Sequence, residues 1–370
     1  MSGFHGDGDR PLHVRGVLLP DDEVTDLWLV GDRVSREPVP GAVTVADGGY
    51  LLPGLVDAHC HVGILRGARP ITSLAEAKAL ARQDRDAGVL AIRDAGSPFP
   101  YPELDDDPEM PRMARAGRHV APVKRYLRDI GIEVPADEVA ATVTAQARAG
   151  NGWVKLVGDW IDRGIGDLAP AWDEETLAGA VAAAHAAGVR ITAHTFSEQA
   201  VATLVRAGID CVEHGTGLSE DLIDEMARRG TALVPTMINI ENFDDIAAQA
   251  EPKFPTYAAH MRALKRRFPE VVRAAVEAGV PVYAGTDAGG GIDHGLIAEE
   301  MWLLHQQAGM STEAVLRAAS WGAREWLGFP GLEHGGLADL VAYDQDPRVD
   351  LRVVRDPKLI ILRGRVVKSR

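Results

Sequence analysis

Residues 50–61 read YLLPGLVDAHCH, an apolar run of strand length that ends in two histidines. Successive side chains of a strand point to opposite faces, so His59 and His61 share one face and Cys60 points to the other. Two imidazoles that reach one point from the same face can bind a metal ion. The alternative is a pair of polar residues at a strand end.

The pattern of this stretch repeats along the chain, because apolar runs of strand length alternate with helical segments. Helices are predicted at, for example, Ser73–Ala87, Ala136–Ala149, Asp173–Ala187 and Ser197–Ala207. Strands are predicted at Leu55–His61, Val89–Asp94, Met113–His119, Trp153–Val157, Arg190–Thr195, Cys211–Gly215, Ala232–Thr236 and Val282–Asp287. Eight strands in alternation with helices predict an α/β fold, a parallel (β/α)8 or TIM barrel, over residues 53–335.

Both ends of the chain carry a different pattern. Apolar residues alternate with polar ones, without a helical period, in Leu12–Pro20, Val24–Val34, Ala338–Tyr343 and Leu359–Lys368. We therefore predict that residues 1–52 and 336–370 together form a small β-sandwich built from both termini.

Three further candidate ligands lie at the ends of predicted strands. His194 lies in RITAHT, His214 in CVEHGT and Asp287 in VYAGTDAGG. Each has a structural alternative, because a single buried histidine is more often a hydrogen-bonded core residue and an aspartate often caps a turn. Together with His59 and His61 they fall on the carboxyl rim of the barrel, where barrel enzymes place their active sites. The set therefore predicts a metal centre.

Lys155 lies within the predicted strand WVKLV. Its neighbours Val154 and Leu156 point outward beneath helices, so Lys155 points into the barrel. Burial of an ammonium group is costly and lowers its pKa, and a neutral amine can react with carbon dioxide to give a carbamate that bridges two cations. The alternative is a lysine that pairs with an inner carboxylate.

Three residues are weaker candidates for substrate binding. His294 follows the last predicted strand in GGGIDHG, Trp160 lies just past Lys155, and Tyr126 lies on a rim loop. His294 could instead support the metal ligands from behind, and a rim loop is by default solvated.

The composition is typical of a globular protein, and its few cysteines predict a cytoplasmic location. The formal net charge of -15 disfavours phosphate backbones, so we expect no nucleic-acid partner. The chain has two cysteines, which is no disulfide framework, and neither a signal peptide nor a membrane segment is expected. A small-molecule substrate is the expected partner, and a homo-oligomer is left open.

The segments LLPGLVDAHCHVG, WVKL, ITAHT, VEHGT and AGTDAG resemble, in order and spacing, the amidohydrolase superfamily. They are most similar to its imidazolonepropionase-like and prolidase-like branch of metal-dependent hydrolases. The resemblance covers nearly the whole chain. It includes GGYLLPGLVDAH, which leads into the barrel, and GGLADLVAYDQDP, which leads out of it.

The resemblance implies a binuclear centre with six metal ligands: His59, His61, Lys155, His194, His214 and Asp287. The first two histidines would bind one metal ion with Asp287, and the other two histidines would bind the second. Lys155, carboxylated by carbon dioxide, and a hydroxide would bridge the two ions. We expect zinc, although imidazole-rich sites also accept cobalt, manganese or iron. Asp287 would carry a proton from the nucleophile to the leaving nitrogen.

The expected function is hydrolysis of an amide-type carbon–nitrogen bond in an acyl-amino acid, dipeptide, carbamate, urea or cyclic amide. One alternative is a mononuclear deaminase of the same fold. That chemistry usually has a glutamate three residues after the fifth-strand histidine, where this chain has Ser197, followed by Glu198. The other alternative is an inactive metal-bound scaffold, which a missing ligand would favour.

Overall fold

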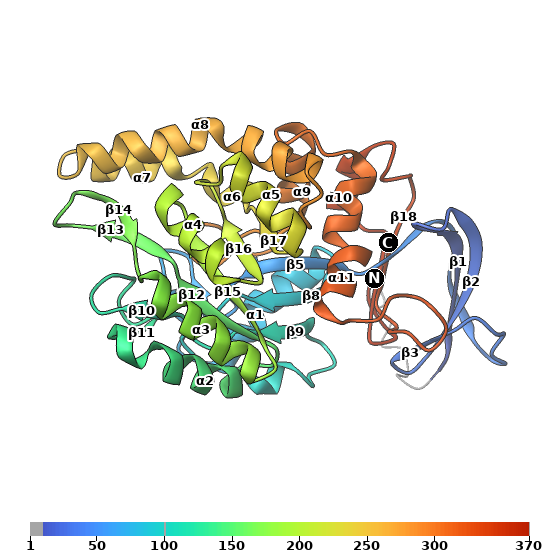
Figure 1. Cartoon of the computed structure of the whole chain (residues 1–370). Helices are drawn as coiled ribbons and strands as arrows, with labels where there is room; N and C mark the ends of the chain where they lie inside the picture. Colours follow the sequence, from blue (N-terminus) through green and yellow to red (C-terminus); the bar gives the residue numbers. More distant parts are fainter. Residues whose placement is uncertain (1–9, 100, 370) are drawn as a thin grey trace.

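The computed structural model describes residues 10–99 and 101–369. Figure 1 shows a central group of strands with helices around it and, to one side, a separate group of strands that includes β1 and β2. The larger hydrophobic core lies between the central strands and the helices, and a smaller core lies on the sheet built from the chain ends.

The strands of the two chain ends form one seven-stranded sheet in the order β20-β19-β18-β4-β1-β2-β3. Strand β4 joins the two ends, because it pairs in parallel with β1 and in antiparallel with β18. The described strands of this unit belong to a single hydrogen-bonded sheet, so the predicted sandwich and its boundaries stay predictions. The strands are β1 (Leu12–Leu18), β2 (Glu23–Val30), β3 (Arg33–Ser35), β4 (Val43–Pro53), β18 (Leu340–Tyr343), β19 (Leu359–Leu362) and β20 (Arg365–Ser369).

The central strands form two parallel sheets, with the orders β5-β8-β9 and β11-β10-β12-β15-β16-β17. The alternation of strand and helix along the chain produces this arrangement, because each parallel pair needs a crossover connection. The strands are β5 (Leu55–Cys60), β8 (Val89–Asp94), β9 (Arg112–Arg115), β10 (Val120–Pro122), β11 (Ile132–Val134), β12 (Trp153–Val157), β15 (Arg190–Thr195), β16 (Cys211–His214) and β17 (Ala232–Val234).

The segment predicted as the eighth strand, Val282–Asp287, links the two sheets through backbone hydrogen bonds. The N–H of Asp287 donates to the carbonyl of His59 in β5 at 2.7 Å, and the N–H of Tyr283 donates to the carbonyl of Leu233 in β17 at 3.0 Å. The segment therefore lies between β5 and β17. The parallel α/β fold is confirmed, and a closed eight-stranded barrel stays a prediction.

Several helices begin at capping residues that the sequence supplies. Ser73 accepts a hydrogen bond from the N–H of Glu76, and Asp173 accepts one from the N–H of Thr176. The α-helices are α1 (Leu74–Asp86), α2 (Val139–Ala149), α3 (Glu174–Ala186), α4 (Glu198–Ala207), α5 (Glu220–Arg229), α6 (Met237–Ile240), α7 (Phe243–Ala250), α8 (Pro255–Glu277), α9 (Ile297–Gln306), α10 (Thr312–Ala319) and α11 (Trp321–Leu327). Short 3-10 turns lie at Pro102–Leu104, Ala136–Glu138 and Leu351–Arg355.

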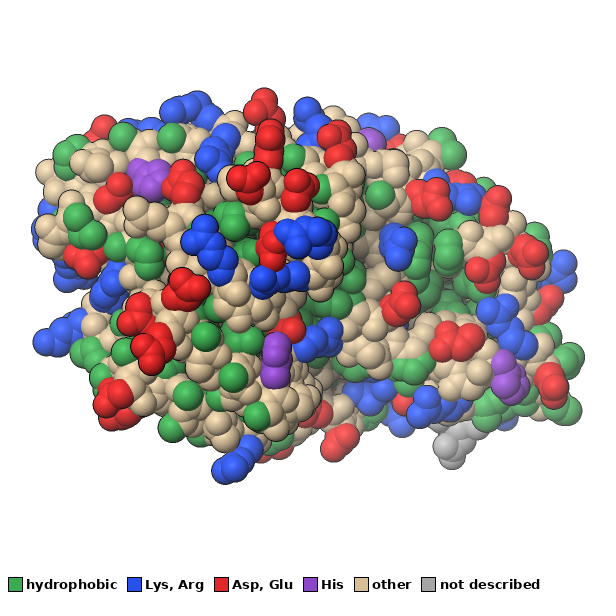
Figure 2. Space-filling view, viewed as in Figure 1, with side chains coloured by type: hydrophobic (Ala, Val, Ile, Leu, Met, Phe, Trp, Pro, Cys, Tyr) green, Lys and Arg blue, Asp and Glu red, His purple; other side chains and the backbone are tan. Residues whose placement is uncertain are grey.

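Two small hairpins lie outside these layers: β6 (Ile64–Leu65) with β7 (Arg69–Pro70), and β13 (Asp159–Asp162) with β14 (Asp167–Pro170). On the surface, Figure 2 shows acidic and basic side chains interspersed over one face of the molecule. None of the helices in the described ranges combines the length and the apolar character needed to cross a membrane.

Candidate metal centre

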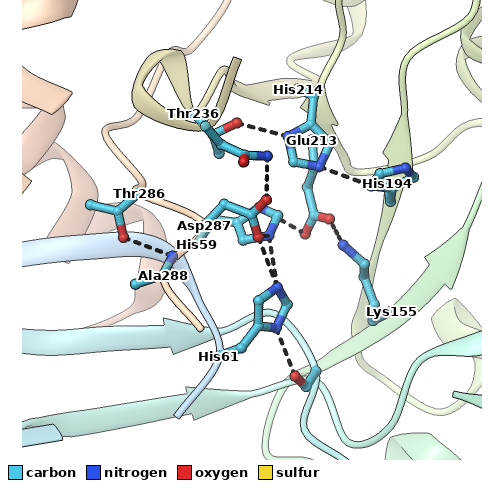
Figure 3. Close-up of polar contacts among 12 residues, drawn as sticks. His59, His61, Lys155, His194, Glu213, His214, Thr236, Thr286, Asp287 and Ala288 are labelled. Carbon is cyan, nitrogen blue, oxygen red and sulfur yellow. Dashed lines mark hydrogen bonds and ion pairs between the residues drawn. The ribbon is translucent and has the colours of Figure 1, made fainter. Parts of the chain in front are cut away.

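Three of the predicted ligands meet at one point (Figure 3). His59 Nε2 lies 3.3 Å from His61 Nε2, and Asp287 Oδ1 lies 3.1 Å from the first nitrogen and 3.0 Å from the second. Both histidines come from the end of β5, as the strand period predicts, and Asp287 comes from the segment beside it. Nitrogen and oxygen donors around a tetrahedral zinc ion lie about 3.3 Å from one another. The three groups therefore fit one divalent cation.

A second pair of predicted ligands lies beside the first. His194 lies one residue before the end of β15 and His214 ends the neighbouring β16, and His194 Nδ1 lies 2.9 Å from His214 Nε2. The ring of His214 also lies 5.3 Å from the ring of His59, measured between centroids. The structure thus brings four histidines and one aspartate together, in two adjacent groups of donors.

Hydrogen bonds from behind fix how these rings point. His61 Nδ1 lies 2.8 Å from the carbonyl of Gly96, and His214 Nδ1 lies 2.7 Å from Thr236 Oγ1. Such contacts orient an imidazole so that its other nitrogen faces the centre. In contrast, His59 Nδ1 and His194 Nε2 are buried without a hydrogen-bond partner in the described part of the chain.

The backbone is strained at three positions around the centre. His214, Thr236 and Asp287 all have positive φ angles, of 63°, 51° and 59°. Residues with a side chain rarely adopt this conformation, and it persists at functional sites where the surroundings enforce it.

The protonation states suit metal ligation. Burial lowers the pKa of His59 and of His214, and it lowers the pKa of His194 to about 3. Burial raises the pKa of Asp287, but the His59 and His61 rings outweigh it and hold this pKa well below its usual range. Neutral imidazoles and an ionised carboxylate are the forms that bind metal ions.

Lys155 lies on β12, is buried, and faces the carboxylate of Glu213 (Figure 3). Burial lowers the pKa of its amine to about 7. Glu213 also lies 3.1 Å from Arg93 Nη1 and accepts a hydrogen bond from Thr192 Oγ1 at 2.9 Å. The inward position predicted for Lys155 is observed, and so is the inner carboxylate of the alternative interpretation. The sequence analysis did not single out Glu213.

Comparison with known proteins identifies the family. A family model described as "Amidohydrolase family" matches residues 50–367. The chain belongs to the amidohydrolase family. An uncharacterized protein of Mycobacterium tuberculosis is 56% identical over 355 residues, which cover 96% of this chain and 95% of that one. The ochratoxinase of Aspergillus niger is 26% identical over 231 residues, which cover 60% of this chain and 47% of that one.

Solved structures share the fold of this amidohydrolase. A Xaa-Pro dipeptidase with methionine bound in its active site has a TM-score of 0.81 and 22% identity, over 97% of this chain and 100% of that one. The crystal structure of the Aspergillus niger ochratoxinase has a TM-score of 0.80 and 20% identity, over 97% and 96%.

An aromatic wall borders the candidate metal centre of the amidohydrolase. The ring of Trp160 lies 5.5 Å from that of His194, a predicted metal ligand, and 5.0 Å from that of Tyr126. Trp160 and Tyr126 are two of the residues predicted to bind substrate. His119 continues the wall, because its ring lies 5.2 Å from Tyr126 and 5.1 Å from His61. Both ring nitrogens of His119 are buried without a hydrogen-bond partner among the described residues. Sequence reasoning used His119 only as a strand end.

His294 points elsewhere. Its Nδ1 lies 2.7 Å from Asp84 Oδ2 on α1, and the donor atoms of His294, Asp84 and Cys60 all lie within 4.8 Å of one another. Cys60 is on the face of β5 opposite the two histidines, as predicted, so this cluster lies behind the strand. The role of His294 in substrate binding stays a prediction.

Glu198 bears on the alternative of a mononuclear deaminase, and Asn239 is a further contact of the candidate metal centre. Glu198, next to the position where a deaminase would carry its glutamate, is exposed and lies 3.1 Å from His260 Nε2 on α8. Asn239 of α6, which no sequence pattern singled out, donates from Nδ2 to Asp287 Oδ2 at 2.6 Å.

Proposed function

We propose that this amidohydrolase hydrolyses an amide-type carbon–nitrogen bond of a small molecule with the help of two divalent metal ions. The observation that carries the proposal is the convergence of His59, His61 and Asp287 within 3.3 Å of one another, beside the His194–His214 pair. The first group would hold one ion and the second pair the other. Zinc suits this donor set of imidazole and carboxylate.

When bound, two metal ions lower the pKa of a shared water and polarise the scissile carbonyl. The chain itself supplies Asp287, the carboxylate among the predicted ligands. Its Oδ1 faces the two histidines of β5 and its Oδ2 faces Asn239, so the carboxylate lies at the centre in a fixed orientation. We assign to Asp287 the transfer of a proton from the nucleophile to the leaving nitrogen.

Lys155 would bridge the two groups of donors as a carbamate. A pKa of about 7 leaves a large neutral fraction of the amine, which is the form that reacts with carbon dioxide. Carboxylation replaces a cation beside Glu213 with an anion, and this needs a remaining positive charge nearby. Arg93, at 3.1 Å from Glu213, supplies that charge.

The aromatic wall supports a substrate with a flat or apolar group beside the scissile bond. Tyr126 and Trp160 supply ring surface, and the two free nitrogens of His119 are donors or acceptors for a polar substrate group. These features favour acyl-amino acids and dipeptides over small cyclic amides. Among the solved structures that share this fold, the Xaa-Pro dipeptidase acts on a dipeptide by its name.

We further propose that the two parallel sheets close into the predicted (β/α)8 barrel. The segment Val282–Asp287 already joins β17 to β5. Closure would place the carboxyl ends of all eight strands on one rim, and the ends of β5, β15 and β16 carry the four histidines.

Metal content per chain, measured by elemental mass spectrometry on protein purified without chelator or metal-affinity tag, tests the proposal. About two equivalents, with turnover of at least one amide in a panel of acyl-amino acids, dipeptides, carbamates and ureas, would support it. About one equivalent with release of ammonia would favour the mononuclear deaminase. No metal after reconstitution with zinc and bicarbonate would overturn it.

A further inference from the structure

Helix α6 is a single turn that follows β17 and contacts the candidate metal centre at both of its ends. Thr236 lies just before the helix, and its Oγ1 is 2.7 Å from His214 Nδ1. Asn239, within it, donates to Asp287 Oδ2 at 2.6 Å. One short turn therefore holds a ligand from each of the two groups of donors.

Helix α6 is not stable by itself. A helix of four residues is far below the length that is stable alone, and its first N–H groups have no partner within the turn. Thr236 also has a φ of 51°, which is unfavourable for a β-branched residue. The conformation must be enforced from outside.

Glu300 on α9 provides that support. Its Oε1 accepts a hydrogen bond from the N–H of Met237 at 2.9 Å, and its Oε2 accepts one from the N–H of Ile238 at 2.8 Å. The residue is completely buried. A buried carboxyl group is costly unless it is hydrogen-bonded, and each oxygen of this one is paired with α6. Neighbouring Glu299 instead points outward and lies 3.3 Å from Arg355.

We propose that Glu300 is a positioning residue: it clamps α6, so that Asn239 fixes the Asp287 carboxylate and Thr236 fixes the His214 ring. With Oδ2 held by Asn239, the Asp287 carboxylate cannot rotate and presents Oδ1 to His59 and His61. The consequence for catalysis rests on the proposed function, whereas the clamp itself does not.

Hydrogen–deuterium exchange tests the clamp without any substrate or metal. In Glu300→Ala, the Met237 and Ile238 amides should exchange at least ~10-fold faster than in the wild type, because each loses a buried acceptor. Glu300→Gln keeps one acceptor oxygen and should release only one of the two amides. Glu299→Ala, on the same helix, should change neither. Unchanged exchange in both Glu300 variants would overturn the proposal.

A double-mutant cycle tests whether Glu300 acts through Asn239. On the best substrate of the panel, Glu300→Gln and Asn239→Ala should each lower kcat by ~10–100-fold with little change in KM. The double variant should lose less than the product of the two losses, because part of the effect of Glu300 passes through Asn239. Multiplicative losses would show that Glu300 acts by another route and would overturn this part of the proposal.

The visible absorption spectrum of the cobalt-loaded protein gives the same comparison without turnover, since it reports the geometry of the ligands. Glu300→Gln and Asn239→Ala should each shift the spectrum, and Glu299→Ala should not. Identical spectra in wild type, Glu300→Gln and Asn239→Ala would contradict the positioning role. If the wild type binds no cobalt, the proposed function fails, and the exchange experiment still decides the clamp.

Discussion

Lys155 and Glu213 face each other between the central strands, and both side chains are almost completely buried. They lie on strands β12 and β16, which are separated in the sheet by β15. An ammonium and a carboxylate at this depth stabilise each other, and removal of Lys155 leaves Arg93 as the cation that still pairs with Glu213. The pair therefore explains how a buried lysine is tolerated at the centre. It also means that a substitution of Lys155 changes the charge balance around Glu213.

Replacement of Lys155 should remove the bridge between the two groups of donors. In Lys155→Ala, metal content should fall from about two equivalents to about one or less, and activity should be lost, because the second ion keeps only His194 and His214. Elemental mass spectrometry and turnover check this. Lys358→Ala, which affects a partly exposed lysine paired with Asp344, is the control and should keep both. Near-normal turnover in Lys155→Ala would reject the carbamate role.

Replacement of Asp287 by asparagine should lower the rate of catalysis without disturbing the fold. Asp287→Asn keeps the size of the side chain but removes the proton acceptor, so kcat should fall by ~10²–10⁴-fold while the circular dichroism spectrum and thermal midpoint stay close to those of the wild type. Steady-state kinetics on the best substrate measure the loss. A fully active variant would exclude Asp287 as the proton carrier.

Cys60 should be dispensable for metal binding. Its side chain is fully buried on the face of β5 opposite His59 and His61, so Cys60→Ala should keep the metal content and activity of the wild type. We expect a cost of about 1–2 kcal/mol in the free energy of unfolding, from the small cavity left behind. Denaturant titration and metal analysis check the two parts. Loss of metal would contradict the strand orientation.

The His294–Asp84 pair should make stability depend on pH. Burial lowers the pKa of His294, but the carboxylate of Asp84 outweighs it and raises this pKa above 6.5. Because the folded state holds the proton more tightly than the unfolded state, the contribution is complete below about pH 6.5 and is lost as the pH rises through the folded pKa.

Denaturant titrations of the wild type and of Asp84→Asn between pH 5.5 and 9 measure this effect. The stability difference between the two proteins should be largest at the acidic end and should shrink toward the alkaline end. A difference that grows with pH would show that the pair is not held together by a protonated His294.

Trp160 should contribute to substrate binding rather than to chemistry. Its ring borders both His194 and Tyr126, so Trp160→Ala should raise KM by ~10-fold and leave kcat within a few-fold. Trp302→Ala on α9, whose ring lies 6.0 Å from His305, is the matched control. An unchanged KM for every substrate in the panel would exclude Trp160 from the pocket.

Much of the centre could be predicted from local patterns. The period of a strand places His59 and His61 on one face and Cys60 on the other, and alternation of strands with helices brings the strand ends of a parallel sheet to the same edge. His194, His214 and Asp287 therefore meet those histidines although they are far apart in the sequence. Ser73 and Asp173 mark helix starts for an equally local reason.

The remainder depended on tertiary structure. Glu213 and His214 are neighbours that strand alternation would send to opposite faces, yet both contact the centre, because His214 has a positive φ of 63°. A local sequence pattern does not predict a positive φ angle for a residue other than glycine. Asn239 and Glu300 likewise gain their contacts only when α6 and α9 pack together across some sixty intervening residues. The sequence by itself thus determined the ligands that regular strands deliver, whereas the packed fold decided which buried groups hold those ligands in place.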